Sequence, residues 1–353
     1  MKFGVGFQSH IENTWRHALL AEQVGFDCAW LVDSQLLTSD VYACLTLAAH
    51  HTRRIQLATG ITVAGTRIAP VIAHAIATVN QLAPGRTILG LGAGHTAWRS
   101  MGMPPVPIKA FRETVEVCQG LLRGQTVPFS LRGHAADIHF MDTTNGYINI
   151  DDPIPVVVAA SHPRAQALAG ELGDGVLSLS LLDPDLLAAD LSGVARGWAL
   201  REGGRPADYR VATIGISCVL HPGEATNSPR VLSRVGPRIA VSLHYAYEQA
   251  RAGREVPPFV AHFLTPEYVS YLDARWAEMH ATHSRRLHPG EDRFITPEAI
   301  RALSLTGSRD EILERLRALE AAGLTEIVVS PPWGFVEESI VEFASEIVRH
   351  YRS

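Results

Sequence analysis

Short apolar runs alternate with longer amphipathic stretches along nearly the whole chain, and this rhythm constrains the fold more than any other feature. A short continuous apolar run is typical of a buried parallel strand, and strands separated by helices pair in parallel through right-handed crossovers. Eight such strand and helix units predict an α/β fold, a (β/α)8 TIM barrel, in preference to an open doubly wound sheet. The predicted strands begin near Phe3, Ala29, Ile55, Thr87, Val156, Val176, Val211 and Ile327.

Two stretches depart from this rhythm. Short runs with glycines predict a hairpin-like excursion near residues 126–149. Near residues 229–297 no strand pattern occurs, and residues 231–252 and 266–286 have the spacing of helices. We therefore expect one domain over residues 1–353, with insertions at the carboxyl-terminal face of the barrel that include a helical insertion before the last strand.

Local signals predict the ends of several elements. Residues 55–63 and 211–220 each indicate one unbroken strand. The pattern Ser308-x-x-Glu311 is typical of a capping box and predicts the start of a helix that ends at Gly323.

The composition excludes several classes of function. A formal net charge of −5 without a basic block argues against nucleic acid or an anionic membrane as the main partner. No apolar stretch is long enough to span a membrane, and a short strand-like run follows Met1 in place of a signal peptide. The cysteines form no C-x-x-C pair, which favours buried thiols in a reducing compartment. We therefore expect a cytoplasmic globular protein.

The stretch from Thr87 to Trp98 contains the first candidate site residues. It is predicted to be a buried strand that ends in alternating glycines, Gly90, Gly92 and Gly94. Missing side chains there let a flat ligand approach the backbone, or they relieve crowding inside the barrel. The side chains that follow are His95, Thr96 and Trp98. Residues at the carboxyl ends of barrel strands form the active site in this fold, so we place the site here.

The other predicted strand ends carry small or neutral polar side chains, and Asp33 is the only carboxylate among them. A glycosidase would need two carboxylates, and a metal hydrolase would need several closely spaced His and Asp ligands. His280 and His283 could share a helix face but lack a third ligand, so no metal site is predicted. Backbone N–H groups and hydroxyls at the strand ends suit an anionic phosphate and a flat ring system.

At this point the chain resembles a known family, the bacterial luciferase-like flavin- and deazaflavin-dependent oxidoreductases. The resemblance runs over nearly the whole length and is only loose in the helical insertion. It is similar above all to the methylenetetrahydromethanopterin reductase-like branch, which uses the deazaflavin coenzyme F420. The matching segments include Trp30-Leu-Val-Asp-Ser-Gln35, Thr59-Gly-Ile-Thr62, Gly90-Leu-Gly-Ala-Gly94, Pro155-Val-Val-Val-Ala-Ala160 and Ala322-Gly-Leu-Thr-Glu-Ile-Val-Val-Ser330.

The resemblance implies how the coenzyme is held. Relatives place the ring against a bulge in the third strand that contains a cis peptide bond, which falls here at Gly60-Ile61; the alternative is an ordinary trans bulge. The coenzyme phosphate is expected at the backbone amides that follow the fifth strand, with Thr96 or Trp98 across from them. The full set of implied cofactor-binding residues is Asp33, Gly60, Ile61, Thr62, Gly94, Thr96, Trp98, Ala159, Ala160, Ser161 and His162.

Two residues are candidates for catalysis under this resemblance. His95 stands where relatives place a proton donor, although it could equally only hydrogen-bond the ring. Asp33 matches the acidic position of the family, but Ser34 replaces the histidine that many relatives carry next, and Asp33 could instead be a structural acceptor for loop amides. Arg67, Lys109 or Arg112 could assist an acidic coenzyme tail, or each could be a solvated surface charge.

The predicted function is hydride transfer between reduced F420 and a small organic substrate. The cofactor carries the difficult chemistry, and the protein supplies orientation and a dry pocket. The alternative is a monooxygenase that uses reduced FMN and oxygen and is supplied by a separate flavin reductase. A further alternative is a flavin-binding protein without turnover. The resemblance also implies a homodimer.

Overall fold

The computed structural model describes residues 1–178, 182–256, 258–279 and 284–353, apart from the side chains of His95 and Pro258. The chain divides into two compact units. Unit 1 consists of Met1–Ser180, Pro184–Ile214 and Glu320–Val328. Unit 2 consists of Leu181–Asp183, Gly215–Leu319 and Val329–Ser353. Whether the chain is one domain stays a prediction.

Unit 1 is built on a closed parallel barrel. Its strands follow the order β3-β2-β1-β13-β10-β9-β8-β5-β4, and β3 also pairs with β5, which closes the sheet. All eight predicted strands are present, so the predicted TIM barrel is confirmed. The strands are β1 Lys2–Gln8, β2 Cys28–Val32, β3 Gln56–Thr59, β4 Thr62–Val63, β5 Thr87–Gly92, β8 Val156–Ala159, β9 Gly175–Ser178, β10 Arg210–Gly215 and β13 Glu326–Val329.

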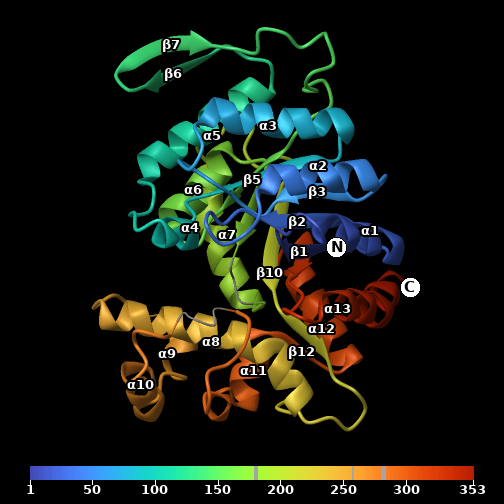
Figure 1. Ribbon diagram of the computed structural model, residues 1–353, viewed down its shortest axis with the longest axis vertical. Coiled ribbons are helices and arrows are strands. Elements are labelled where there is room, and N and C mark those ends of the chain that lie inside the picture. The colour runs from blue at the N-terminus through green and yellow to red at the C-terminus, as the bar shows by residue number, and fades with distance from the viewer. Residues whose placement is uncertain (179–181, 257, 280–283) are drawn as a thin grey trace. The chain divides into compact units, whose positions relative to one another are not determined.

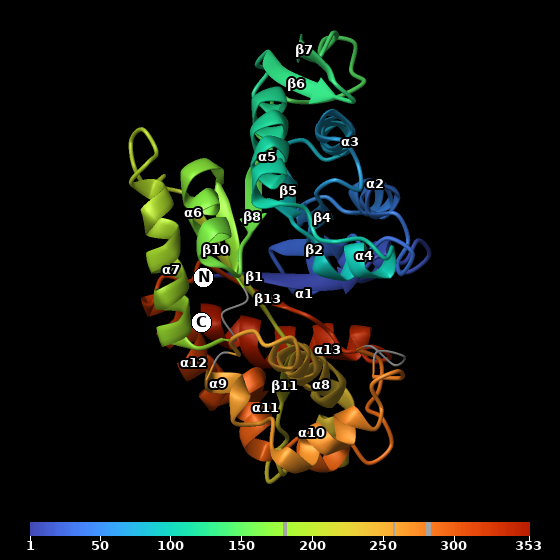
Figure 2. The ribbon, with the colours of Figure 1, turned by 90° about the vertical axis from the view of Figure 1, so that its left-hand side faces the viewer.

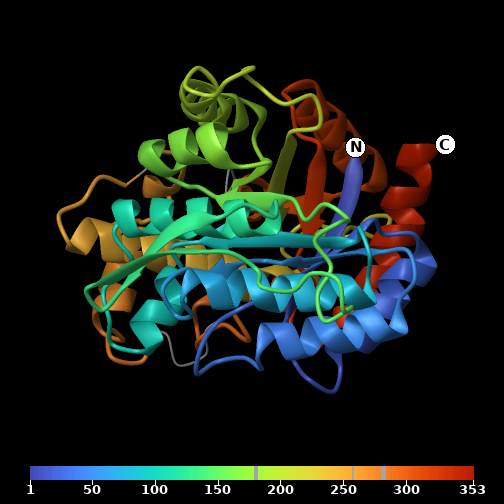
Figure 3. The ribbon, with the colours of Figure 1, turned by 90° about the horizontal axis from the view of Figure 1, so that it is seen from above.

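Helices connect these strands and lie outside them (Figure 3). They are α1 Thr14–Val24, α2 Val41–His51, α3 Ala69–Leu82, α4 His95–Ser100, α5 Ile108–Leu122, α6 Pro163–Leu172 and α7 Pro184–Trp198. Their ends follow local chemistry. The carboxylate of Asp40 caps α2 by accepting from the N–H groups of Tyr42 and Ala43, and Gly25 ends α1 at a φ of 99°. Helices α6 and α7 pack side by side (Figure 2).

A buried polar cluster lies inside the amino-terminal end of the barrel. The indole Nε1 of Trp30 donates to Oε1 of Glu326 at 2.8 Å. Arg210 donates to Oε2 of Glu326 and to Oε1 of Gln56, both at 2.6 Å. Arg210, Gln56 and Glu326 are the first residues of their strands, so the cluster joins the starts of β3, β10 and β13 around the Trp30 side chain. Each charge is paired, as a buried charge must be.

The excursion after α5 contains an antiparallel hairpin of β6 Val127–Leu131 and β7 His134–Ile138. The hairpin lies beside α3 and α5 (Figure 1). An apolar pocket between these elements contains the imidazoles of His74 and His139 but no carboxylate or cysteine among its lining residues.

Unit 2 is mainly helical and has its own core, centred on Val235, Ile239, Leu243 and Tyr268. A two-stranded parallel sheet of β11 and β12 completes it. Its elements are β11 Ser217–Val219, α8 Pro229–Arg251, α9 Pro258–Ala261, α10 Pro266–Asp273, η1 Asp292–Phe294, α11 Pro297–Leu303, β12 Leu305–Gly307, α13 Val336–Phe343, η2 Ala344–Val348 and α14 Arg349–Arg352. Helix α12, Arg309–Ala321, runs from unit 2 into unit 1.

Three predicted element boundaries differ from the structure. The expected strand 55–63 is interrupted between β3 and β4, and the expected strand 211–220 divides into β10 in the barrel and β11, which pairs with β12. The expected helix 266–286 was too long, because α10 ends at Asp273 and turns follow in the described residues up to 279. The predicted capping box is confirmed, since Ser308 N–H donates to Glu311 at 2.6 Å and Glu311 N–H approaches Ser308 Oγ at 3.4 Å.

Within the described ranges, none of the helices combines the length and the apolar character that crossing a membrane requires.

Candidate functional site

The carboxyl-terminal end of the barrel in unit 1 contains a backbone bulge between β3 and β4. The Gly60-Ile61 peptide bond is cis, which confirms the geometry implied by the resemblance. The N–H of Gly60 donates to the carbonyl of Leu31 at 2.6 Å. A Cβ on Gly60 would lie 2.9 Å from the Cβ of Trp30, so only glycine fits against β2 here. The bulge turns the half-buried Ile61 toward the neighbouring strand β5.

The glycines of β5 make room for this bulge. A Cβ on Gly90 would lie 2.1 Å from the carbonyl oxygen of Thr59, and one on Gly92 would lie 2.6 Å from Cδ1 of Ile61. The Cβ of Ala159, from β8, is 3.1 Å from the same position at Gly92. At Gly90 and Gly92 the missing side chains therefore relieve crowding inside the barrel, and Ile61 and Ala159 surround the strand end.

Asp33 follows β2 and is held by several donors. It is only 4% exposed. Its carboxylate accepts from Arg67 at 2.8 Å, from the Nε2 of Gln35 at 2.8 Å and from the N–H of Val63 at 3.3 Å. These contacts fix the chain directly after the bulge. A carboxylate with this many donors is better suited to holding the site than to abstracting a proton, although its role stays a prediction.

Thr62, the residue before Val63, is held by α2. It is fully buried, and its Oγ1 shares a 2.8 Å hydrogen bond with the hydroxyl of Tyr42. Burial raises the pKa of the Tyr42 phenol well above its ordinary range, so the hydroxyl stays protonated. The guanidinium of Arg67 lies 5.2 Å from the centre of the Tyr42 ring, which connects this pair to Asp33.

The residues after β5 form the short helix α4, which the sequence pattern did not indicate. It begins after Gly94, whose φ of 68° suits glycine and whose added Cβ would lie 2.3 Å from Val63. Thr96 and Trp98 are half-buried on α4. The side chain of His95 lies outside the part of the chain that the structure describes. The indole Nε1 of Trp98 is buried and, among the described residues, has no hydrogen-bond partner.

The proposed phosphate site lies between β8 and α6. Ala160 is buried, and its N–H donates to the carbonyl of Leu177 at 3.0 Å, so this amide belongs to the barrel. Ser161 and His162 are exposed, and no described hydrogen bond uses their N–H groups. Helix α6 starts at Pro163, where the first amides of a helix favour an anion. The N–H groups of Ser161 and His162 are therefore the ones that remain for a phosphate.

Two of the three cations considered for an acidic coenzyme tail are neutralised. Arg67 is paired with Asp33 at 2.8 Å and with Asp40 at 2.5 Å. Arg112 on α5 binds both carboxylate oxygens of Glu171 on α6, at 2.8 and 2.6 Å. Lys109 is exposed and has no ion pair with the described residues. Both arginines therefore already have a carboxylate partner, and their role toward a coenzyme tail stays a prediction.

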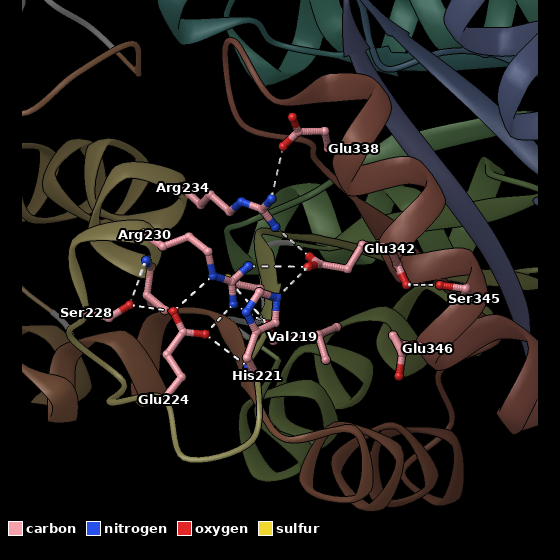
Figure 4. Close-up of polar contacts among 12 residues, drawn as sticks. Val219, His221, Glu224, Ser228, Arg230, Arg234, Glu338, Glu342, Ser345 and Glu346 are labelled. Carbon is pink, nitrogen blue, oxygen red and sulfur yellow. Dashed lines mark hydrogen bonds and ion pairs between the residues drawn. The ribbon is translucent and has the colours of Figure 1, made fainter.

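Unit 2 contains a cluster of ion pairs around Arg230 and Arg234 (Figure 4). Arg230 donates to both carboxylate oxygens of Glu224, and Arg230 and Arg234 both donate to Glu342. The Arg230 guanidinium holds the pKa of Glu224 well below its ordinary value. These charges compensate one another and join the start of α8 to α13, so the cluster stabilises unit 2. His280 and His283 lie outside the described residues. Among the residues that the structure describes, no group of side chains could hold a metal ion.

Residues 4–326 of the chain match the family described as luciferase-like monooxygenase. The chain is 28% identical over 342 residues to 5,10-methylenetetrahydromethanopterin reductase of Archaeoglobus fulgidus, a match that covers 95% of this chain and 94% of the relative. It is 29% identical over 325 residues to F420-dependent glucose-6-phosphate dehydrogenase of Beutenbergia cavernae, covering 86% of this chain and 93% of the relative.

The same fold occurs in a solved structure, the coenzyme F420-dependent tetrahydromethanopterin reductase of Methanopyrus kandleri. The two chains superpose with a TM-score of 0.73 over 99% of each, at 23% identity. This likeness shows the closed barrel with its insertions.

Proposed function

Because the chain belongs to the luciferase-like monooxygenase family, we propose that it is an oxidoreductase that transfers a hydride between the deazaflavin coenzyme F420 and a small organic substrate. One observation carries this proposal. The similarity to relatives named for F420 or for methylenetetrahydromethanopterin reduction extends over 95% of the chain in one case and 86% in another. The substrate stays unspecified, since the two relatives are named for different substrates.

The residues at the barrel end fit such a coenzyme. A flat ring needs an apolar support with a few polar groups at its edge, and a phosphate needs unpaired amide donors. Ile61 and Ala159 provide the apolar support, and the buried Nε1 of Trp98 has no partner among the described side chains. The amides of Ser161 and His162 at the start of α6 are the proposed phosphate donors.

The remaining residues have positioning roles in this proposal. Asp33 and Tyr42 hold Val63 and Thr62, the two residues that follow the Gly60-Ile61 bulge. Gly94 lets α4 begin close to β4, which brings Thr96 and Trp98 to the strand ends. When bound, the reduced coenzyme supplies the hydride. We assign to His95 the delivery of the matching proton, a step for which an imidazole has a suitable pKa range near neutral pH.

We also propose a cytoplasmic homodimer. The four cysteines are free and buried, which is consistent with a reducing compartment. On α3, Val71 and Leu82 are each 48% exposed, and Ile68, directly before the helix, is 41% exposed. Exposed apolar side chains on one helix face support contact with a second copy. Light scattering on the purified protein measures the mass, and a monomer at micromolar concentration would contradict the homodimer.

The description of the matched family favours one second candidate, an FMN-dependent monooxygenase that receives reduced FMN from a separate reductase. The two functions differ in their need for oxygen. The purified protein should oxidise reduced F420 in the presence of a suitable substrate under nitrogen, with substrates screened by the loss of reduced coenzyme. Turnover only with reduced FMN and oxygen would exclude the first function and favour the second.

A further inference from the structure

We propose that Gln35 contacts the bound ring and that its Oε1 accepts a hydrogen bond from the ring's imide N–H. Gln35 follows Asp33 at the carboxyl end of β2, in unit 1. This inference extends the proposed function by one contact. It concerns an edge that flavin and deazaflavin rings share, a cyclic N–H flanked by two carbonyl groups, and so it can be tested separately from the choice between them.

The orientation of the Gln35 amide follows from its neighbour. Its Nε2 donates to Oδ1 of Asp33 at 2.8 Å, and Asp33 also binds the guanidinium of Arg67. A carboxylate paired with a guanidinium only accepts hydrogen bonds. Turning the amide over would place its oxygen against the carboxylate oxygen, which is unfavourable. The NH2 group therefore faces Asp33, and the carbonyl oxygen must point away from it.

The carbonyl oxygen of Gln35 is buried and lacks a donor within the described part of the chain. A buried acceptor without a partner is costly and therefore uncommon in a native protein. A buried donor without an acceptor occurs on α4, the indole N–H of Trp98, which has no partner among the described residues. The two elements lie close together, because Ser100 Oγ on α4 is 3.2 Å from the main-chain oxygen of Gln35.

An imide edge satisfies both orphaned atoms. Its N–H supplies the donor that Gln35 Oε1 lacks, and a flanking carbonyl oxygen supplies the acceptor that the Trp98 Nε1 lacks. A phosphate offers acceptors alone at neutral pH, and an apolar substrate offers neither group. The ring of the coenzyme is therefore the ligand whose chemistry matches the pair.

The test is a titration of the full-length apo-protein with four ring compounds, followed by fluorescence. The compounds are the deazaflavin riboside without its phosphate tail, FMN, and the derivative of each that is methylated at the imide nitrogen. The variants are Gln35→Met, which keeps the side-chain length, and Trp98→Phe. Trp198→Phe is the matched control, because it makes the same change at another half-buried indole, which packs edge-on against Tyr209. Trp198 ends α7, which leads into the start of β10 at the other end of the barrel.

We expect Gln35→Met to lower the affinity for the two rings that carry the imide N–H by about tenfold, as for a lost buried hydrogen bond. Methylation of the imide nitrogen should lower the affinity of the wild type by a similar factor. The affinity of Gln35→Met for a methylated ring should then be no lower than either change alone produces. Trp98→Phe should lower the affinity for all four compounds, and Trp198→Phe should change the affinity for none of them. Thermal unfolding of each apo-variant checks that it is folded.

If Gln35→Met lowers the affinity for methylated and unmethylated rings equally, the proposed contact is wrong. An unchanged affinity would also contradict it. If the wild type binds FMN and not the deazaflavin, the F420 assignment fails while the FMN pair still decides the role of Gln35. Binding of neither ring would overturn both proposals.

Discussion

Arg67 donates a hydrogen bond to Asp33 across 2.8 Å, and the carboxylate that it neutralises is only 4% exposed. This pair lies directly beside the Gly60-Ile61 bulge, because Asp33 also accepts from the N–H of Val63. The pair explains why a lone carboxylate at a strand end can persist without a catalytic role. It holds the segment against which the coenzyme ring is proposed to rest.

Arg67→Met should destabilise the protein by about 2–4 kcal/mol, because it leaves Asp33 buried without its counter-charge. Chemical denaturation measures the loss. Arg196→Met is the matched control, since Arg196 is exposed on α7 and has no ion pair with the described residues. A loss no larger than that of the control would show that the pair does not stabilise the barrel end.

Trp30→Phe should lower the free energy of unfolding by about 1.5–3 kcal/mol, because it removes a hydrogen bond to the buried Glu326 carboxylate. Trp198→Phe removes at most a contact to the neutral hydroxyl of Tyr209 and should cost less. Equal losses in the two variants would mean that ring volume, and not the hydrogen bond to Glu326, decides the effect.

The ion pair between Arg112 and Glu171 should make stability depend on pH. Hydrogen bonds from Arg112 hold the pKa of Glu171 below its ordinary value, against the opposing effect of burial. A lowered pKa in the folded state contributes stability above the unfolded value of about 4.3, and this contribution is lost as the pH falls through the folded pKa. Arg112→Gln should therefore cost about 0.5–1 kcal/mol at neutral pH and almost nothing near pH 3. A cost that is constant over this range would contradict the pair's role.

Ser161→Pro should lower the affinity for F420 by about tenfold, because it removes an amide donor at the start of α6. Ser161→Ala keeps this amide and should bind normally. The deazaflavin riboside, which has no phosphate, should bind both variants alike. If the affinity for the riboside falls as much as the affinity for F420, the proline acts by changing the fold of the segment. The phosphate would then bind elsewhere.

His95→Ala should lower kcat by about 100-fold or more while coenzyme affinity changes little, since general acid catalysis is worth about that factor. Stopped-flow absorbance under nitrogen follows the hydride step, and fluorescence gives the affinity. The pH profile of kcat should lose its dependence near the pKa of an imidazole, about 6.5. A variant with wild-type turnover would remove His95 from the mechanism.

The barrel can be predicted from the sequence because its strands are local features. A run such as Val156–Ala159 is continuously apolar, and such runs are favourable only where both faces are buried. Helix caps such as Asp40 and the Ser308-Glu311 pair are also local, so these signals give the correct element order.

The interruption of the third strand has only a weak local signal, the single Gly60. It depends on Gly90 and Gly92, which are distant in sequence and leave the space that the bulge occupies. The exit of β11 from the barrel likewise depends on a partner, β12, that lies far along the chain. Helix α10 ends at Asp273 although its helical spacing continues, and turns follow up to residue 279.

The site was only partly predictable for the same reason. Glycine and polar residues at strand ends indicate where a ligand binds, and the resemblance implies the cis bond at Gly60-Ile61. Which charges are neutralised is a tertiary property, so the pairing of Arg67 with Asp33 could not be read from residue types. Gln35 follows Asp33 in the sequence, but only the direction of its amide makes it a candidate ligand contact.

The central claim is that this barrel end binds a deazaflavin coenzyme. The most direct measurement is a parallel titration of the purified apo-protein with F420 and FMN, each oxidised and reduced, by calorimetry or fluorescence. We predict that F420 binds with a Kd at least about tenfold lower than that of FMN, a difference of about 1.4 kcal/mol. Preference for reduced FMN, or binding of neither coenzyme, would contradict the claim.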